Sequence, residues 1–164
     1  MSGKVLVACV GNVFLGDDAF GVEVAKRLTE RPLPAGVSVI DFGIRSYDLA
    51  YALMNQWDLK ILVDALPRGG KPGTLYVMEP DLPASVGQEA LDAHSMNPVA
   101  VLQLVNALGG EVGRLLVVGC EPETVEPSAE GEIGLSEPVH GALDEAVRVI
   151  EGLIVGATSP AIAA

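Results

Sequence analysis

The chain has 164 residues, which is the size of one domain and leaves no room for two catalytic domains. Hydrophobic residues make up 49% of it but aromatic residues only 4%, which excludes disorder and predicts a core of Val, Leu, Ile and Ala; no apolar run is long enough to span a membrane. Ten Lys and Arg against 22 Asp and Glu give a net charge of −12, which excludes a general nucleic-acid binder. We expect a cytoplasmic protein with neither a membrane nor a nucleic acid as partner.

The first half of the chain alternates short β-branched segments with longer amphipathic ones. This pattern predicts strands at 4–10, 37–41 and 60–64, and helices at 18–29 and 46–54. Asp17 is expected to cap the first helix and Ser46 the second. Such alternation is typical of a mostly parallel sheet with helices on both faces.

The second half continues the pattern. We predict strands at 74–79 and 114–119, a helix from 98 to the Gly109-Gly110 pair with Asn97 as its cap, and a last helix from Ser136 to about 155. The turn-rich stretch 67–73 is too short for a crossover helix, so strands 60–64 and 74–79 are expected to pair antiparallel in a mixed sheet. Residues 1–155 then form a single α/β domain, and 156–164 a flexible tail.

Three chemically active side chains follow the ends of predicted elements. Asp18 lies in the loop after the first strand, Asp64 closes the third strand, and His94 precedes the helix that begins at 98. Taken singly, each has an ordinary role at a helix start, in a turn or in solvent. Loops leaving the carboxyl ends of parallel strands, however, converge on one edge of the sheet, where ligands bind. Two carboxylates and one imidazole there predict an open site for a divalent metal such as nickel, zinc, iron or manganese.

Other candidate sites are weaker. Loop 11–18 lacks the glycine spacing of a dinucleotide loop and the Lys-Ser/Thr of a phosphate loop, and its acids would repel a phosphate. The serine elbow and the zinc-protease helix motif are both missing from the sequence. We expect Cys9 and Cys120 to be buried thiols, Asp41 to form a turn, and His140 to lie at the surface or core edge.

Several of these segments together resemble the hydrogenase maturation endopeptidases, which trim the carboxyl-terminal extension from the large subunit of nickel-iron hydrogenases. The similar segments are VGNVFLGDDAFGV (10–22), LVDA (62–65), the lone His94, GCEP (119–122) and GLS (134–136). The resemblance covers roughly residues 4–155, and the ordered combination is more specific than any one motif. It implies a three-layer αβα fold, phosphorylase/hydrolase-like, with a twisted, mixed, mostly parallel five-stranded sheet.

The resemblance also implies a function. The chain would be a monomeric endopeptidase whose catalytic and metal-contacting residues are Asp18, Asp64 and His94. Nickel would be presented by its partner, the precursor of a [NiFe] hydrogenase large subunit, and other divalent metals would occupy the site in vitro. Two departures stand out: some relatives carry Glu at position 18, and 41–44 differs from the Gly-Gly-Thr of many relatives.

Three alternatives remain open at this point. A nickel-sensing or chaperone module would bind the same precursor without cutting it. A peptidyl-tRNA-hydrolase-like enzyme also opens with a strand and a Gly-Asn loop, but its substrate requires a basic groove. A metal-independent protease of the spore-germination type is the third. The group that activates the attacking water, a metal-bound water or a carboxylate pair, is likewise open.

Overall fold

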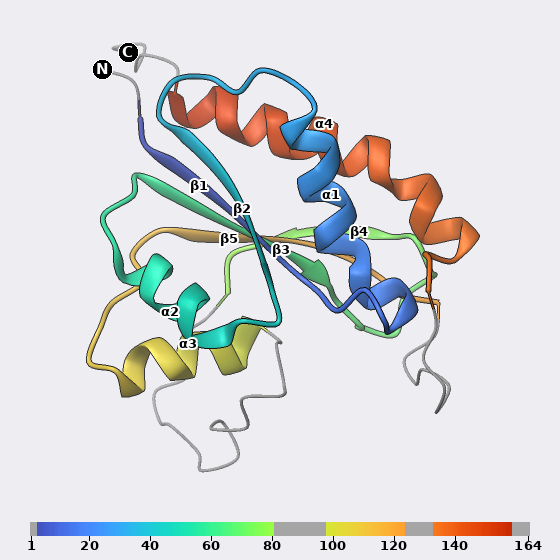
Figure 1. Cartoon of the computed structure of the whole chain (residues 1–164), viewed down its shortest axis with the longest axis horizontal. Helices are drawn as coiled ribbons and strands as arrows, with labels where there is room; N and C mark the ends of the chain where they lie inside the picture. Colours follow the sequence, from blue (N-terminus) through green and yellow to red (C-terminus); the bar gives the residue numbers. More distant parts are fainter. Residues whose placement is uncertain (1–2, 81–97, 124–132, 159–164) are drawn as a thin grey trace.

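A computed structural model describes residues 3–80, 98–123 and 133–158 (Figure 1). It has a five-stranded sheet with helices on both faces. The strands are β1 (Val5–Val10), β2 (Val37–Gly43), β3 (Leu59–Ala65), β4 (Leu75–Met78) and β5 (Leu115–Cys120). The helices are the 3-10 turn η1 (Gly16–Ala19), α1 (Phe20–Thr29), α2 (Ser46–Met54), α3 (Pro98–Ala107) and α4 (Glu137–Thr158). Within the described residues, no helix has the length and apolar character that crossing a membrane requires.

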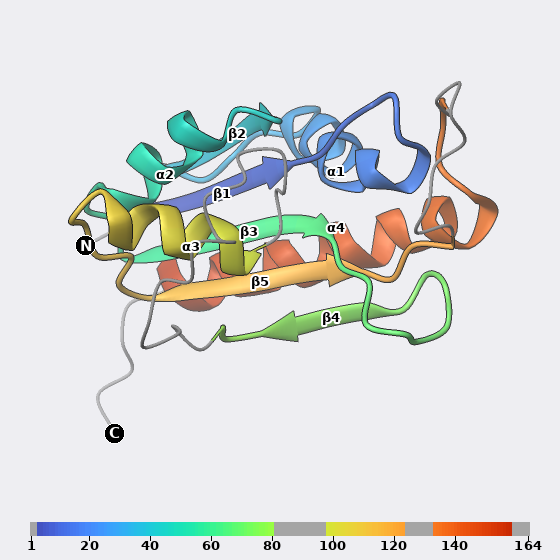
Figure 2. The ribbon, with the colours of Figure 1, turned by 90° about the horizontal axis from the view of Figure 1, so that it is seen from below.

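The sheet is mixed and mostly parallel, as predicted. Its strand order is β2-β1-β3-β5-β4. The pairs β1–β2, β1–β3 and β3–β5 are parallel, whereas β4 runs antiparallel to β5. The arrowheads of β1, β3 and β5 therefore point to the same edge in Figure 2, and β4 points away from it.

The predicted pairing of strands 60–64 and 74–79 is wrong, because β5 lies between β3 and β4. The connection after β3 passes over the carboxyl end of β5, where Leu66 N–H donates to the Cys120 carbonyl at 2.8 Å and Gly73 N–H to the Glu121 carbonyl at 2.9 Å. The short connection does reverse the chain direction, as predicted. It is nevertheless long enough to cross two strand spacings, about 10 Å.

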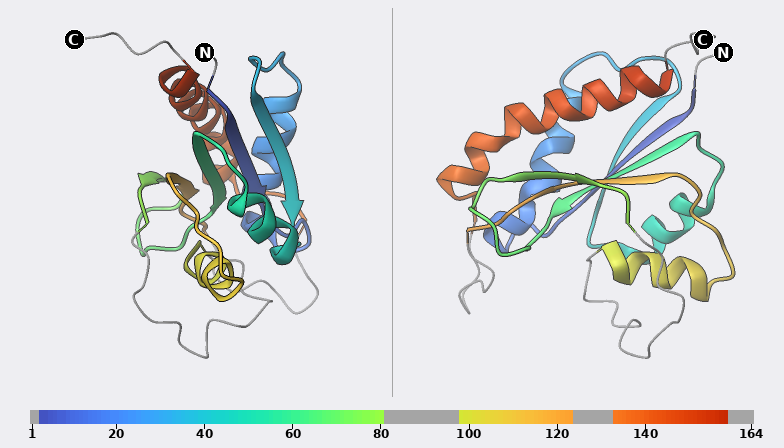
Figure 3. Two further views of the ribbon diagram at one scale, coloured as in Figure 1. Left: turned by 90° about the vertical axis from the view of Figure 1, so that its left-hand side faces the viewer. Right: turned by 180° about the vertical axis from the view of Figure 1, so that it is seen from behind.

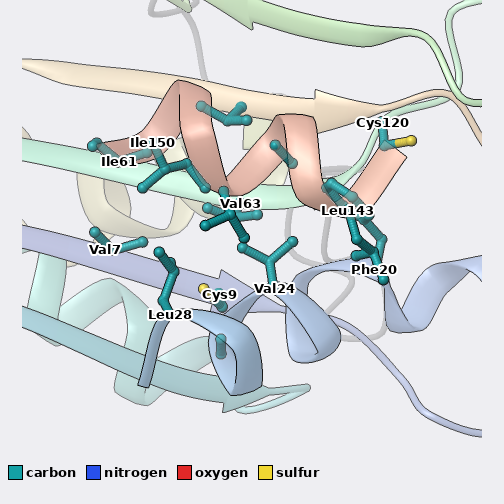
Figure 4. Close-up of a cluster of buried hydrophobic side chains, with 14 of the residues drawn as sticks. Val7, Cys9, Phe20, Val24, Leu28, Ile61, Val63, Cys120, Leu143 and Ile150 are labelled. Carbon is teal, nitrogen blue, oxygen red and sulfur yellow. The ribbon is translucent and has the colours of Figure 1, made fainter. Parts of the chain in front are cut away.

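The helices form two layers, one on each face of the sheet (Figure 3). Alternate residues of β1 face opposite layers, so Val7 and Cys9 pack with α1 and α4, whereas Leu6 and Ala8 pack with α2 and α3. Figure 4 shows the α1/α4 side of the core, which is filled mainly by aliphatic side chains, with Phe20 beside Leu143 at one end. Burial on both faces explains the continuous apolar runs in the parallel strands. The two helical layers around the sheet confirm the predicted three-layer αβα fold.

The helix ends differ in detail from the predicted ones. Neither Asp17 nor Ser46 makes a capping hydrogen bond to its own helix: residue Arg45 occupies the N-cap position of α2, and Ala19 that of α1. Ser136 does precede the last helix, and its carbonyl accepts the His140 N–H at 2.9 Å. That helix continues to Thr158, so three residues assigned to the tail are helical.

The amino end of β3 is tied to its surroundings by a buried lysine. Lys60 is only 4% exposed, and its Nζ donates to the carbonyl oxygens of Leu53 and Val112. Burial lowers the pKa of this amine. The lysine thus links the end of α2 and the segment before β5 at the edge of the sheet opposite to the candidate residues.

At the carboxyl edge, η1 and the start of α1 approach the strands very closely. A Cβ at Gly21 would lie 2.2 Å from the Val10 carbonyl oxygen and 2.6 Å from that of Val63. A Cβ at Gly11 would lie 2.2 Å from the Asp18 carbonyl oxygen. Only glycine permits these approaches, which seat the turn carrying Asp18 against the ends of β1 and β3.

Replacing Gly21 by alanine is therefore expected to destabilise the protein strongly. The added methyl group meets backbone atoms that cannot move aside, so we expect the free energy of unfolding to fall by about 1 to 3 kcal/mol. The matched control is Gly152→Ala in α4, where a Cβ meets nothing within 4 Å. That change should stabilise the helix by about 0.5 to 1 kcal/mol. Urea unfolding of both variants checks the pair, and equal stabilities would contradict the close packing.

Candidate acidic site at the carboxyl edge of the sheet

Asp64 ends the buried part of β3 with a carboxyl group that is almost inaccessible to solvent. Strand alternation places it on the α2/α3 face together with Leu62, and it is 4% exposed. Burial raises the pKa of Asp64 well above its ordinary value, the charge of Asp18 raises it further, and a hydrogen bond from the Ala65 backbone opposes both effects. An ionised Asp64 is therefore costly unless a cation neutralises it.

Asp18 lies in η1 with its carboxylate held in one orientation. The side chain is half-buried, and its Oδ2 accepts the Asn12 N–H at 3.0 Å. Burial raises the pKa of Asp18, and the bond from Asn12 acts in the opposite direction. The turn η1, which carries Asp18, packs against β3, which carries Asp64, and the charge of Asp18 raises the pKa of Asp64. The structure thus brings together two of the three residues singled out in the sequence.

His94, the third residue, lies outside the described residues. The described chain resumes at Pro98, and α3 packs on the face toward which Asp64 is directed. Within residues 3–80, 98–123 and 133–158, no three His, Cys, Asp or Glu side chains are placed to hold a metal together. A three-ligand site therefore requires His94 or another group from outside these ranges, and the role of His94 stays a prediction.

Asp17 has a different task from its neighbour Asp18. It is 5% exposed, and its carboxylate accepts three hydrogen bonds: from Ser136 N–H at 2.7 Å, Ser136 Oγ at 2.8 Å and Glu123 N–H at 2.8 Å. Asp17, which we expected to cap a helix, thus links η1 to two segments that are distant in the sequence. Sequence reasoning missed it because both partners are more than a hundred positions away along the chain.

Glu121 is a second buried acid that the sequence analysis did not single out. Its Oε1 accepts the N–H groups of Arg68 at 2.9 Å and Gly70 at 2.7 Å, and the Tyr76 hydroxyl at 2.8 Å. Burial acts to raise its pKa, but these bonds and the Arg68 charge together hold the pKa below the usual range. Glu121 thereby fixes the connection between β3 and β4 beside Asp64. Its place directly after a buried strand was the available signal.

The remaining candidates take the ordinary roles expected of them. Asp41 is exposed, and its Oδ1 accepts the Gly43 N–H at 2.8 Å, as in a turn. His140 is exposed on α4. Cys9 and Cys120 are free, buried thiols. Burial, followed by the charges of Asp17 and Glu121, raises the pKa of Cys120 to about 12, so it is not a thiolate nucleophile at neutral pH.

We expect Asp64→Asn to stabilise the metal-free protein at neutral pH. A raised pKa means that the folded state binds more protons than the unfolded state, so the wild type loses stability as pH rises above the ordinary Asp value. The gain from Asn should therefore grow with pH from about pH 4 upward. Urea midpoints across this range, with the exposed Asp144→Asn as control, provide the measurement. If the stability of the wild type relative to Asp64→Asn rises with pH, the raised pKa of Asp64 is contradicted.

Glu121→Gln should change the stability in the opposite direction and destabilise the protein. Its depressed pKa means that its contribution is present above the ordinary Glu value and is lost as pH falls through the folded-state pKa. An amide keeps one acceptor oxygen and turns a donor toward other N–H groups, so we expect a loss of about 1 to 3 kcal/mol at pH 7. The loss should shrink below about pH 4. Urea unfolding at both pH values checks this, and a pH-independent difference would exclude the charged interaction.

Comparisons with known proteins identify the family. The family model described as "HycI: Hydrogenase maturation protease" matches residues 22–153. A relative described as a hydrogenase maturation protease, from Methanocaldococcus jannaschii, is 34% identical over 153 residues, covering 92% of this chain and 96% of the relative.

Solved structures point to the same family. The hydrogenase maturating endopeptidase HybD of Escherichia coli is similar with a TM-score of 0.71 and 26% identity, over 93% of both chains. The [NiFe] hydrogenase maturation protease HybD of Thermococcus kodakarensis is similar with a TM-score of 0.63 and 26% identity, over 92% of this chain and 99% of that one. The fold, the acidic pair at its carboxyl edge and these matches lead to one conclusion: the chain belongs to the HycI family of hydrogenase maturation proteases.

Proposed function

We propose that this endopeptidase removes the carboxyl-terminal extension from the nickel-loaded precursor of a [NiFe] hydrogenase large subunit, acting in the cytoplasm as a monomer. The observation that carries the proposal is the pair of carboxyl groups, Asp18 and Asp64, which η1 and the end of β3 bring to the same edge of the sheet. None of the ion pairs formed between described residues involves either acid. Free and buried thiols suit a reducing compartment.

The donor chemistry of the pair fits a metal ion brought by the substrate. Carboxylate oxygens and an imidazole nitrogen are ligands that nickel and similar divalent ions accept. Asp18 and Asp64 would contribute the oxygens, and His94, four positions before α3 in the sequence, the nitrogen. When nickel is present in the precursor, it supplies the positive charge that two adjacent acids lack.

This arrangement favours loaded over empty precursor. The charge of Asp18 raises the pKa of Asp64, so the two acids gain free energy when a cation lies between them and gain nothing from a surface that brings no cation. Most of that gain depends on the ion rather than on the peptide around it. Precursor without nickel would therefore dock weakly and remain uncut.

Side chains of this chain also serve the hydrolytic step. Asp18 is held by the Asn12 amide, which fixes the direction of its carboxylate relative to β3. Cleaving a peptide bond requires a group that accepts a proton from water and a group that returns one to the leaving amine. Two carboxyl groups in one site, of which one favours the protonated form, have the chemistry for both tasks.

Processing of a purified precursor tests the proposal. We expect the wild type to shorten nickel-loaded precursor at its carboxyl terminus and to leave nickel-free precursor intact, as read by mass spectrometry. Asp18→Asn, Asp64→Asn and His94→Ala should each lower the cleavage rate at least about 100-fold, because each removes a ligand or a proton carrier. Circular dichroism should show all three variants folded.

The control is Asp144→Asn, which removes an exposed acid on α4 that pairs with Arg27. It lowers the negative charge by the same amount as Asp18→Asn and Asp64→Asn do, but it should leave the cleavage rate unchanged. Binding of nickel-loaded precursor without any shortening would indicate the nickel-sensing chaperone instead. Wild-type rates in the three site variants would overturn the site assignment.

A further inference from the structure

The acid doublet at the start of the candidate site is divided between two tasks. Asp17 and Asp18 are consecutive in η1, a 3-10 turn, in which adjacent side chains diverge by about 120°. Asp18 is directed to the Asn12 amide and influences Asp64, whereas Asp17 is directed to Ser136 and Glu123. The turn is consequently held from two sides.

Asp17 holds η1 on the side that faces Ser136 and Glu123. η1 has no side-chain cap at its amino end, where Leu15 occupies the N-cap position. The side chain of Asp17 instead reaches both ends of the segment that connects β5 to α4: Glu123 near its start, and Ser136 immediately before α4. The three bonds measure 2.7 to 2.8 Å and involve both carboxylate oxygens.

The bonding pattern requires a group that accepts with both of its side-chain atoms. All three partners of Asp17 donate: two are backbone N–H groups and one is the Ser136 hydroxyl. An asparagine in this place offers one acceptor oxygen, and its NH₂ group would face a donor. Because Asp17 is almost fully buried, water cannot replace the lost partner. The replacement Asp17→Asn therefore releases at least one of the two segments from η1.

We infer that Asp17 is a positioning residue for the protease site: its buried carboxylate joins η1 to the β5–α4 connection and so holds Asp18 beside Asp64. This inference rests on the proposed function of the acidic pair. Both carboxylate oxygens of Asp17 are already bonded within the chain, so we assign it no contact with the substrate or the metal. It acts on Asp18 through the single peptide link between them, and a displacement of about 1 Å in a catalytic group is enough to slow an enzyme about 100-fold.

Steady-state cleavage of nickel-loaded precursor by Asp17→Asn and Ser136→Ala tests the inference. For Asp17→Asn we expect kcat to fall about 10- to 100-fold, while KM changes less than about threefold, because Asp18 is misplaced but the docking surface is intact. Ser136→Ala removes only the hydroxyl bond and keeps the backbone N–H, so its effect on kcat should be smaller. The control Ile150→Val removes one methylene from the α1/α4 core without touching η1.

Hydrogen exchange supplies a readout that does not depend on activity. If Asp17 is merely structural, Asp17→Asn should speed hydrogen exchange only at the Glu123 and Ser136 amides, which lose their acceptor. A positioning Asp17 would also speed exchange at the Asn12 amide, which is bonded to Asp18. We expect the Asn12 amide to respond in Asp17→Asn and not in Ile150→Val.

The outcomes separate this inference from the proposed function. If the wild type leaves the loaded precursor uncut, the proposed function fails, while the exchange of the Asn12 amide still decides whether Asp17 holds Asp18. If the wild type cuts and Asp17→Asn matches Ile150→Val in both kcat and Asn12 exchange, the positioning role is overturned. A fall in kcat without a change at the Asn12 amide would overturn it as well.

Discussion

The close approach of η1 and α1 to the ends of the parallel strands is the constraint on which the site depends. Two glycines, Gly11 and Gly21, allow backbone to lie against backbone where any other residue would collide. This contact turns the chain sharply after β1 and brings Asp18 to the end of β3. The close backbone packing at these two glycines therefore determines where Asp18 lies relative to Asp64. The electrostatics then work against the pair, since burial and like charge both penalise ionisation.

Most of the fold could be predicted from the sequence because its strands are buried on both faces. Continuous apolar runs and 3.6-residue periodicity identified the five strands and four α-helices of the described chain, and the mixed, mostly parallel character of the sheet followed from connection lengths. The partner of β4 could not be predicted in this way. A short connection fixes the direction of the next strand, but the insertion of β5 between β3 and β4 depends on contacts of a strand that comes later in the chain.

The site could be predicted only in part, for a similar reason. Asp18 and Asp64 follow strand ends, so topology alone places them on one edge. Asp17 and Glu121 also follow this rule, but their functions depend on partners that are distant in sequence: Ser136 for the first, Arg68 for the second. Local rules assigned Asp17 to a helix cap, and the longer-range partners prevailed because they supply three donors to one buried carboxylate.

The pairing of β4 has a consequence for how the molecule behaves among its own copies. A sheet edge is a row of unsatisfied backbone groups that can recruit a strand from another molecule. Among the described strands, β4 is such an edge; it is only four residues long and runs antiparallel to its neighbour β5. The strand carries an exposed β-branched side chain, Val77, which favours pairing with another strand. The short length of β4 limits such pairing. The fold thereby limits edge-to-edge aggregation at this side.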